Sequence, residues 1–404
     1  MFRKKIIGII NNKNIKIIAL TLLALVLLVF FMQVCRKANR AGGYDFTSFV
    51  LSSQALLHGD NPYKTESPFA YIYPMFFCFL LIPVAILPYW LANLLWFCLN
   101  IAFLFFSIKI ILEMIQEYVS FDFGGFPIVP LTAFFLLLLN IIQNNLLNGQ
   151  VNLLVLFLCV LFVKYFLKEK ELLASVFLSA AISIKIVPAV FLVFLAVRRK
   201  YTSLALTIAF TFVFCLLIPY VFLGNGFLQI FREYFNGFII GSLVNTKYAT
   251  DMFFNIKDFI FYLSPGFKSS IIIRIIPLIA VFVPLIILEI FNIRKGNKYT
   301  DVLIFNIYLL SILLYSPLSE THHLTLLIPA VCVSGLVIIF KERYFKPQLI
   351  LPYFSFFLCI IFAKIIKYGP FYLLAIILLY SIIIRLIIDA FRGKPKNAPS
   401  ARYI

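Results

Sequence analysis

This chain has few acidic residues. Its 404 residues include 16 Asp and Glu against 35 Lys and Arg, and charged residues of both signs make up only 13% of the sequence. Hydrophobic residues make up 63%, whereas soluble globular domains contain about 45–50% apolar and about 25% charged residues. The composition therefore excludes an ordinary water-soluble protein and predicts one that lies mostly within a membrane.

Histidine and cysteine are scarce as well. The three histidines are His58, His322 and His323, and the seven cysteines, an odd number, lie mostly within apolar runs. Such cysteines predict neither a disulfide framework nor a metal cluster. Adjacent histidines at a helix start point about 100° apart, so we expect no shared metal site. The sequence predicts no cofactor.

Basic residues give a net charge of +19, but they do not form a continuous basic face. They gather in short clusters beside apolar runs, which is the positive-inside pattern of cytoplasmic loops, whereas a nucleic-acid interface needs a basic patch or stripe. We therefore expect contact with membrane lipids and no nucleic-acid partner. The clusters lie within residues 3–16, 198–200, 294–298, 341–346 and 392–396.

Long apolar runs predict an all-α, polytopic integral membrane protein. Several approach the roughly 20 residues that cross about 30 Å of hydrocarbon as a helix. They are continuous, whereas strands of a membrane β-barrel alternate apolar and polar residues over about ten positions. No internal repeat is visible, so one transmembrane domain is expected over 1–404. The about twelve predicted membrane helices are 15–34, 73–87, 89–112, 127–143, 150–167, 172–197, 201–223, 270–292, 301–317, 323–340, 348–366 and 370–391.

The first apolar run, 15–34, is expected to remain as an uncleaved membrane helix. Its length of about 20 residues exceeds the roughly 7–15 of a signal-peptide core, and Cys35–Arg40 offers no small-residue cleavage site. With the amino terminus in the cytoplasm, the basic clusters of the second half also fall inside, as in a multi-pass protein of the inner cell membrane. The first outer loop 35–72, the second outer loop 224–269 and the turn 316–323 then face outside.

The side on which the middle of the chain lies stays open. Simple alternation of crossings puts 143–150 in the cytoplasm, whereas a re-entrant pair within 113–197 puts it outside with Asp45. The run 172–197 is a candidate for such a pair because it carries Lys185 and a proline near its centre.

The first outer loop carries a carboxylate just past the first membrane helix. A carboxylate at a membrane boundary costs desolvation energy unless it is paired or used, so Asp45 is the first candidate functional residue. Apolar residues behind it predict a short interfacial helix that ends at Gly59, before an Asn-Pro turn. Tyrosines in this loop fit either an interfacial aromatic belt or a substrate site.

Two further polar groups do not belong in a lipid-facing wall. The stretch Asn144–Asn152 is dense in side-chain amides, which either satisfy one another across helices or hydrogen-bond the hydroxyls of a sugar. Lys185 lies deep in an apolar run whose nearest charges in the sequence are distant. A lysine there must find an anion or reach the interface, so it binds a ligand phosphate or pairs with a carboxylate.

The turn Ser316–His323 holds two of the three histidines. Either imidazole can donate a hydrogen bond to a phosphate. Glu320, in the same turn, can orient one of them.

Taken in order, these segments resemble glycosyltransferase family 87. The motifs run from about residue 40 to 330 and so cover most of the chain. They are Asp45 after the first membrane helix, Leu56-Leu-His-Gly-Asp-Asn-Pro-Tyr63, Tyr73-Pro74, Asn148-Gly-Gln-Val-Asn152, Lys185-Ile-Val-Pro188 with Arg198-Arg-Lys200 behind it, and Ser316-Pro317 before His322-His323.

The resemblance implies a membrane enzyme of the glycosyltransferase-C class with interfacial helices in its outer loops. It implies transfer of a hexose, expected to be mannose, from a polyprenyl-phosphate-linked donor to a lipid or glycan acceptor, with inversion. The active site opens on the extracytoplasmic side, with an Asp of the first outer loop as general base. By position that base is Asp45, and the family also places a histidine at His322.

The expected site is therefore as follows. Asp45 and His322 are catalytic. Lys185, His323 and Arg40 bind the donor phosphate, with Arg36 and Arg232 as other candidate cations. The substrate-binding residues are Tyr44, Asn61, Tyr63, Tyr73, Asn148, Gln150, Asn152 and Glu320.

One departure leaves the acceptor side open. Relatives often carry an Asn-Gln-Ser-like patch late in the second outer loop, where this chain has only Val244–Asn255. The chain has no Asp-x-Asp motif, which a metal-dependent nucleotide-sugar enzyme would require. Two alternatives remain: a lipid or sugar transporter or flippase, which usually has midplane polar residues and internal repeats, and an O-antigen-type polymerase or ligase, which relies on loop arginines, here only Arg232.

Overall fold

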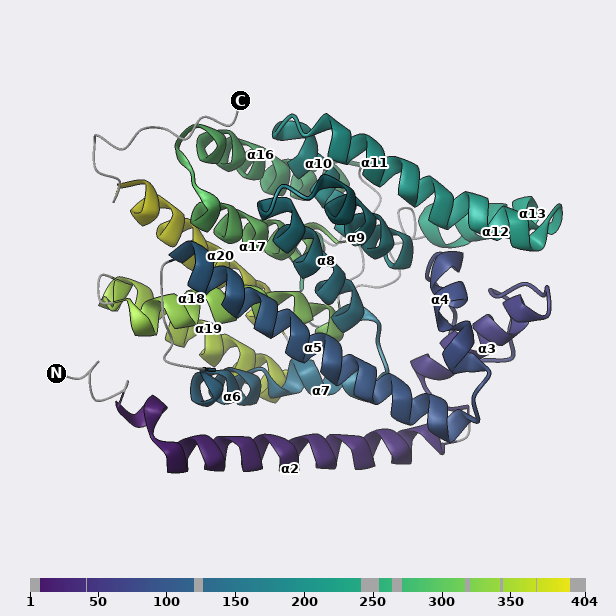
Figure 1. Cartoon of the computed structure of the whole chain (residues 1–404), viewed down its shortest axis with the longest axis horizontal. Coiled ribbons are helices and arrows are strands. Elements are labelled where there is room, and N and C mark those ends of the chain that lie inside the picture. The colour runs from purple at the N-terminus through teal and green to yellow at the C-terminus, as the bar shows by residue number, and fades with distance from the viewer. Residues whose placement is uncertain are drawn as a thin grey trace.

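The computed structural model describes residues 8–40, 42–119, 126–240, 254–263, 271–316, 320–341, 344–367 and 369–392, where every regular element is a helix and no strand occurs (Figure 1). The helices are α2 (Lys13–Ala38), α3 (Asp45–Leu57), α4 (Met75–Ala85), α5 (Tyr89–Val119), α6 (Ile128–Leu137), α7 (Leu139–Leu147), α8 (Asn152–Leu167), α9 (Glu171–Ile184), η1 (Val187–Ala189), α10 (Val190–Val197), α11 (Tyr201–Phe212), η2 (Val213–Leu217), α12 (Ile218–Leu223), α13 (Gly226–Tyr234), η3 (Phe235–Ile240), α15 (Ile256–Leu263), α16 (Ile271–Lys295), α17 (Lys298–Tyr315), η5 (Thr321–Leu327), α18 (Ile328–Phe340), α19 (Pro347–Ile366) and α20 (Phe371–Arg392).

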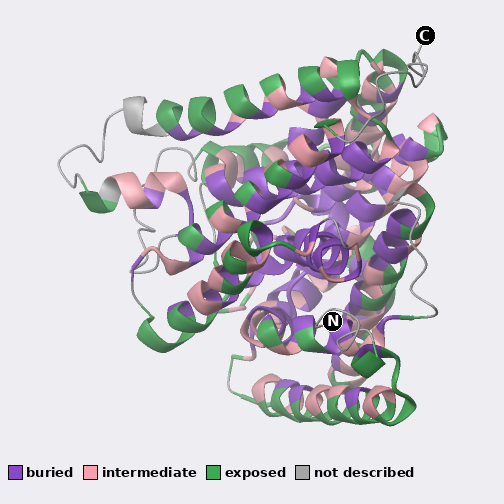
Figure 2. Ribbon diagram, turned by 90° about the vertical axis from the view of Figure 1, so that its left-hand side faces the viewer, coloured by how far each residue is buried: buried purple, intermediate pink, exposed green. Residues whose placement is uncertain are grey.

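Two helices form the centre of the molecule. α17 and the continuous η5–α18 helix are buried along most of their length, and α5, α8 and α20 pack against them. Figure 2 shows buried residues in the middle and exposed ones on the peripheral helices. α2 and the continuous α11–α12 helix bury few of their residues and leave many apolar side chains exposed. This pattern is expected of helices that face lipid, because lipid tails are as apolar as leucine.

In the described ranges, fewer helices are long enough to cross a membrane than the sequence predicts. By length and composition, eight helices in the described ranges can cross a membrane, or nine if the bent pair α6–α7 counts as one, so twelve crossings are not confirmed. The apolar run 73–87 forms α4, whose 11 residues rise only about 16 Å. That length does not cross the hydrocarbon core, and α4 packs against α3 instead.

The apolar run that contains Lys185 folds back on itself. α9 packs on α11, with the Ser175 hydroxyl donating to the Ser203 carbonyl at 3.1 Å, and the Lys200 ammonium lies 3.8 Å from the Glu171 carboxylate. The chain therefore leaves one end of the bundle in α9 and returns to it through α10. Lys185 lies at the tip of this α9–α10 hairpin, where its extended backbone ends α9.

The helix ends define two ends of the molecule. At the first, called the basic end, the Lys164 ammonium lies 2.9 Å from the Glu113 carboxylate and the Lys298 ammonium lies 5.7 Å from the Tyr118 ring centroid. The other end carries α3, α4 and α13 (Figure 1). The α7–α8 junction lies at this end too, because its residue Gln150 hydrogen-bonds Asp45 of α3. Simple alternation of crossings separates Gln150 from Asp45, whereas the structure brings the two together at one end, because α4 is too short to pass through the bundle.

Candidate active site

Asp45 is the first residue of α3, and its carboxylate faces the junction between α7 and α8. The turn before it needs Gly43, whose φ is +67° and whose Cβ would lie 2.1 Å from the Thr47 hydroxyl oxygen. Gln150 Nε2 donates a hydrogen bond to Asp45 Oδ2, and the Tyr73 hydroxyl donates to Gln150 Oε1 at 2.9 Å. The carboxylate is thus positioned by a neutral amide that is itself fixed by a buried phenol.

Gly149 allows the α7–α8 junction to approach α3 this closely. Its φ is +59°, and a Cβ there would lie 2.6 Å from the Phe46 Cβ and 2.8 Å from the Tyr44 ring. Its carbonyl accepts a hydrogen bond from the Trp96 indole at 2.7 Å. Any larger residue would push the junction, and with it Gln150, away from Asp45.

Lys185 reaches the same region from the tip of the α9–α10 hairpin. Its ammonium donates to Asn152 Oδ1 at 2.7 Å and lies 5.7 Å from the Tyr73 ring centroid. Asn152 in turn donates to Asn145 Oδ1 at 3.2 Å, and Asn145 donates to Asn100 Oδ1 at 3.3 Å. These buried amides hydrogen-bond one another, as the first of the two interpretations of Asn144–Asn152 predicts. Asn152 also accepts the hydrogen bond from the Lys185 ammonium.

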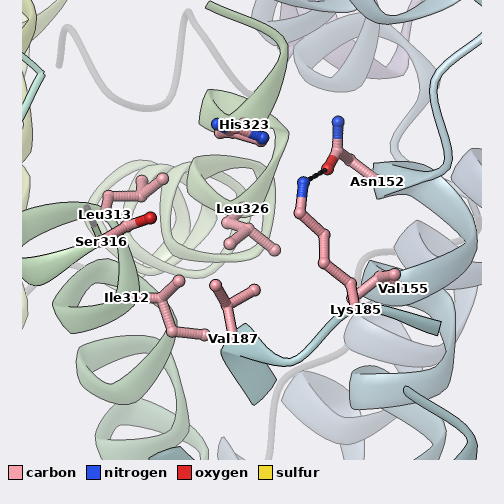
Figure 3. Close-up of a pocket in the computed structure, with 9 residues that line it drawn as sticks. All are labelled: Asn152, Val155, Lys185, Val187, Ile312, Leu313, Ser316, His323 and Leu326. Atoms are coloured by element: carbon pink, nitrogen blue, oxygen red, sulfur yellow. Dashed lines mark hydrogen bonds between the residues drawn. The ribbon is translucent and has the colours of Figure 1, made fainter. Parts of the chain in front are cut away.

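A small cavity lies beside Lys185 (Figure 3). The cation and the side chain of Asn152 occupy one wall, and His323 lies across the space from them. Its volume of about 20 Å³ admits about one water molecule, so a phosphate group would have to widen it. The other lining residues are Ser316 and the apolar Val155, Val187, Ile312, Leu313 and Leu326.

The two histidines occupy different positions. His323 Nδ1 accepts a hydrogen bond from the Glu320 backbone N–H at 2.9 Å, so the neutral ring carries its proton on Nε2. His322 is buried, and its Nδ1 lies 3.6 Å from Glu320 Oε2 without a hydrogen-bond partner in the described part of the chain. The two rings meet edge to face with centroids 4.4 Å apart.

The carboxyls of Asp45 and Glu320 both have a raised pKa. Burial raises the pKa of the Asp45 carboxyl, while the hydrogen bond from Gln150 and the charge of Lys37 lower it. Burial also raises the pKa of Glu320, which Asp45 raises further and Lys185 lowers. Glu320 is thus within electrostatic reach of both Asp45 and Lys185, although no hydrogen bond joins these three side chains directly in the described ranges.

Lys37 is a site residue that the sequence analysis missed. It lies in the last turn of α2, donates a hydrogen bond to Asn148 Oδ1 and lies 5.9 Å from the Tyr44 ring centroid. The predicted phosphate ligand Arg40 is exposed nearby, and no hydrogen bond joins it to Asp45 in the described ranges. A signal was present: cations at the outer end of a first membrane helix run against the positive-inside pattern.

Three predicted substrate-binding residues engage other parts of the protein. The Tyr44 hydroxyl donates to Asn93 Oδ1. Asn61 Nδ2 donates to Glu233 Oε2 at 2.9 Å, and the Tyr63 ring stacks on a tyrosine of α13 with centroids 5.1 Å apart. Asn61 and Tyr63 therefore join the first outer loop to α13, and their contact with a substrate stays a prediction.

The acceptor side of the site lies partly outside the described residues. Of the segment Val244–Asn255, residues 244–253 are not described. Asn255 Nδ2 donates to the Ser316 carbonyl at 3.0 Å, so the end of the second loop lies beside the histidine turn. Arg36 and Arg232 are exposed.

A comparison with protein families agrees with this arrangement. The profile of glycosyltransferase family 87 matches residues 71–317, more than half of the chain. The chain belongs to glycosyltransferase family 87. It is therefore a membrane glycosyltransferase. The matched range of this family-87 glycosyltransferase contains Tyr73, Gln150, Asn152 and Lys185, whereas Asp45 precedes it and the histidines follow it. A comparison with curated proteins finds no match.

Replacing Gly149 tests the close approach of α3 and the α7–α8 junction. Gly149→Ala introduces both an unfavourable φ and a steric overlap, whereas Gly59→Ala, at φ +82° with no atom near the added Cβ, introduces only the first. We expect Gly59→Ala to cost about 1 kcal/mol of unfolding free energy, and Gly149→Ala at least about 1 kcal/mol more. Thermal unfolding in detergent measures the stability of both variants. Equal losses of stability would mean that a side chain fits at Gly149 without steric overlap.

Proposed function

We propose that this glycosyltransferase transfers a hexose, with mannose as the expected sugar, from a polyprenyl-phosphate-linked donor to a lipid or glycan acceptor. The observation that carries the proposal is the placement of one carboxylate, Asp45, and one partly buried cation, Lys185, on the two nearby amides Gln150 and Asn152. A base for the acceptor and a positive charge for the leaving phosphate are the two groups that this reaction needs.

Asp45 is proposed as the general base. The acceptor hydroxyl must lose its proton as it attacks the sugar carbon, and a carboxylate within hydrogen-bond reach accepts that proton. The departing lipid phosphate leaves without protonation, so one carboxylate is enough for an inverting transfer. Inverting glycosidases need a second, acidic carboxyl because their leaving alkoxide must be protonated.

Lys185 is proposed to neutralise the phosphate as it leaves. Its charge is held by neutral Asn152 rather than by a carboxylate, so it remains available to an anion. His323 faces the same cavity and carries a proton on Nε2, which can donate to a phosphate oxygen. Preorganised donors aimed at developing charge are usually the largest single contribution to catalysis.

The basic clusters support an extracytoplasmic site. Arg198 and Lys298 lie at the end of the molecule opposite Asp45, and clusters of this kind mark cytoplasmic ends. We therefore propose that the protein lies in the inner cell membrane with Asp45 and Lys185 facing outward. Family membership favours glycosyl transfer over the transporter or flippase alternative.

Replacing Asp45 tests the base. Asp45→Asn keeps the shape and one oxygen acceptor but cannot accept a proton, so we expect transfer to fall by at least about 10²-fold with unchanged thermal stability. Asp60→Asn is the matched control, because Asp60 is an exposed carboxylate of the same loop. Transfer is measured with membranes and a radiolabelled lipid-phosphate sugar, and near wild-type activity of Asp45→Asn would disprove the assignment.

Replacing Lys37 tests the effect of its charge on the pKa of Asp45. Lys37→Met removes a charge that lowers the pKa of Asp45, so this pKa rises. Because the base works only when deprotonated, activity is then lost at a higher pH on acidification. We expect the acidic limb of the kcat/KM profile to move to higher pH in Lys37→Met and in Gln150→Leu, which removes the hydrogen bond. An unmoved limb in both variants would mean that another group titrates there.

Replacing Lys185 separates donor binding from structural pairing. Lys185→Met keeps the length of the side chain but removes its charge, so we expect the donor KM to rise by at least about 10-fold, as loss of a charge-assisted hydrogen bond implies, while the acceptor KM stays near that of the wild type. Steady-state kinetics with each substrate varied in turn measures both. Equal loss for both substrates with reduced thermal stability would identify a structural role.

Replacing the two histidines is expected to change different kinetic constants. His322→Gln should mainly lower kcat, because His322 is the predicted catalytic imidazole, whereas His323→Gln should mainly raise the donor KM, because His323 faces Lys185 across the cavity. The loss at His322 is expected to be the larger, and neither variant should respond to added divalent metal or chelator. A larger loss at His323 would reverse the two roles, and rescue by Mn²⁺ would overturn the metal-free mechanism.

A further inference from the structure

A second and larger cavity lies at the basic end, far from Asp45 along the helices. Its volume is about 290 Å³, and it lies where α8 and α16 end and where α11 and α17 begin. Its charged and amide lining residues are three cations, two carboxylates and one amide: Arg198, Lys200, Lys298, the exposed Glu169, the paired Asp301 and Asn292. By the proposed orientation this is the level of the cytoplasmic lipid headgroups, but the cavity itself does not depend on the proposed reaction.

One of the three cations is already paired. Arg198 Nε lies 2.5 Å from Glu289 Oε1, and Arg198 Nη2 lies 2.7 Å from Asp301 Oδ1. The Arg198 guanidinium also stacks over the Phe194 ring, with its central carbon 4.4 Å from the centroid. This ion network joins α10 to α16 and α17, and in it Glu289 and Asp301 are both paired with Arg198.

The other two cations, Lys200 and Lys298, have weaker or no ion pairs in the described part of the chain. The Lys200 ammonium lies 3.8 Å from the partly exposed Glu171 carboxylate, a long pairing that contributes little near a surface. The Lys298 ammonium lies over the Tyr118 ring and forms no ion pair in the described part of the chain. The cavity mouth therefore carries two lysines that are available to an anion.

A buried acceptor in the same cavity also lacks a partner. Asn292 is 2% exposed, and its Nδ2 donates to Asp301 Oδ1 at 2.7 Å. Its Oδ1 has no hydrogen-bond partner in the described ranges, and a buried polar atom without a partner costs about 1–3 kcal/mol. A ligand that suits this cavity thus carries a negative charge and at least one hydroxyl donor.

We propose that this cavity binds the headgroup of an anionic phospholipid with a hydroxylated headgroup, such as phosphatidylglycerol. The lipid phosphate contacts Lys200 and Lys298, and a headgroup hydroxyl donates to Asn292 Oδ1. Basic pockets between membrane helices at the cytoplasmic side are suited to phosphate headgroups. Because Arg198 at the cavity wall ends α10, the lipid also stabilises the base of the hairpin that carries Lys185 at its tip.

Lipid-dependent thermal stability of the purified full-length protein in detergent tests the proposal. We expect phosphatidylglycerol to raise the Tm of the wild type and phosphatidylcholine at the same concentration to leave it unchanged. In Lys200→Ala/Lys298→Ala, the apparent affinity for phosphatidylglycerol, from native mass spectrometry, should fall by at least about 10-fold, since each lysine near a lipid surface contributes about 1 kcal/mol. The Tm without lipid should stay unchanged.

Matched controls separate this site from general attraction to charge. Lys364→Ala/Lys367→Ala removes two exposed lysines at the end of α19 and should keep the full response. Asn292→Leu should weaken binding of phosphatidylglycerol but leave binding of phosphatidylethanol, a phosphodiester of the same charge without a headgroup hydroxyl, unaffected. Each single lysine variant should show part of the loss, which covers the case in which the double variant does not fold. A wild-type response in the Lys200/Lys298 variants, or an equal Tm shift from inorganic phosphate alone, would overturn the lipid site.

Discussion

The hydrogen bond from Gln150 to Asp45 joins two segments 105 residues apart, and the arrangement of the helices depends on it. For it to form, the α7–α8 junction must lie at the same end of the bundle as α3. The chain passes through the bundle twice between α3 and the junction, once in α5 and once in the bent pair α6–α7. These two passages return it to the end where α3 lies only if α4 does not cross the bundle as well. α8 then returns to the basic end, so the α9–α10 hairpin must turn back before α11 can begin there.

The hairpin and the junction together explain why the site lies inside the protein. The α9–α10 hairpin carries Lys185 inward from the basic end, while Gly149 brings the junction against α3. Asn152, directly after the junction, receives the lysine ammonium. A lysine in a hydrocarbon environment is costly unless it finds such a partner, so the buried amides and the hairpin stabilise each other.

Sequence reasoning predicted the polar residues of the site better than the path of the chain. Asp45, Gln150 and Lys185 could be found because each costs free energy in an apolar setting unless it is paired or used. The crossings could not be counted, because hydropathy does not distinguish a helix that faces lipid from α4, which is apolar because it is buried against protein. Lys37 was missed because, of the cations that follow the first membrane helix, only Arg36 and Arg40 were considered as ligands of the donor phosphate.

Charged side chains have different partners at the two ends of the molecule. At the basic end Arg198 is paired directly with Glu289 and Asp301. The charges of such a buried pair stabilise each other, and removing one partner leaves the other uncompensated. At the other end the carboxylate of Asp45 and the ammonium of Lys185 each contact an amide instead. Amides position a charge without neutralising it. The difference distinguishes a structural ion network from the candidate site, where neither Asp45 nor Lys185 forms an ion pair with a counter-charge in the described ranges.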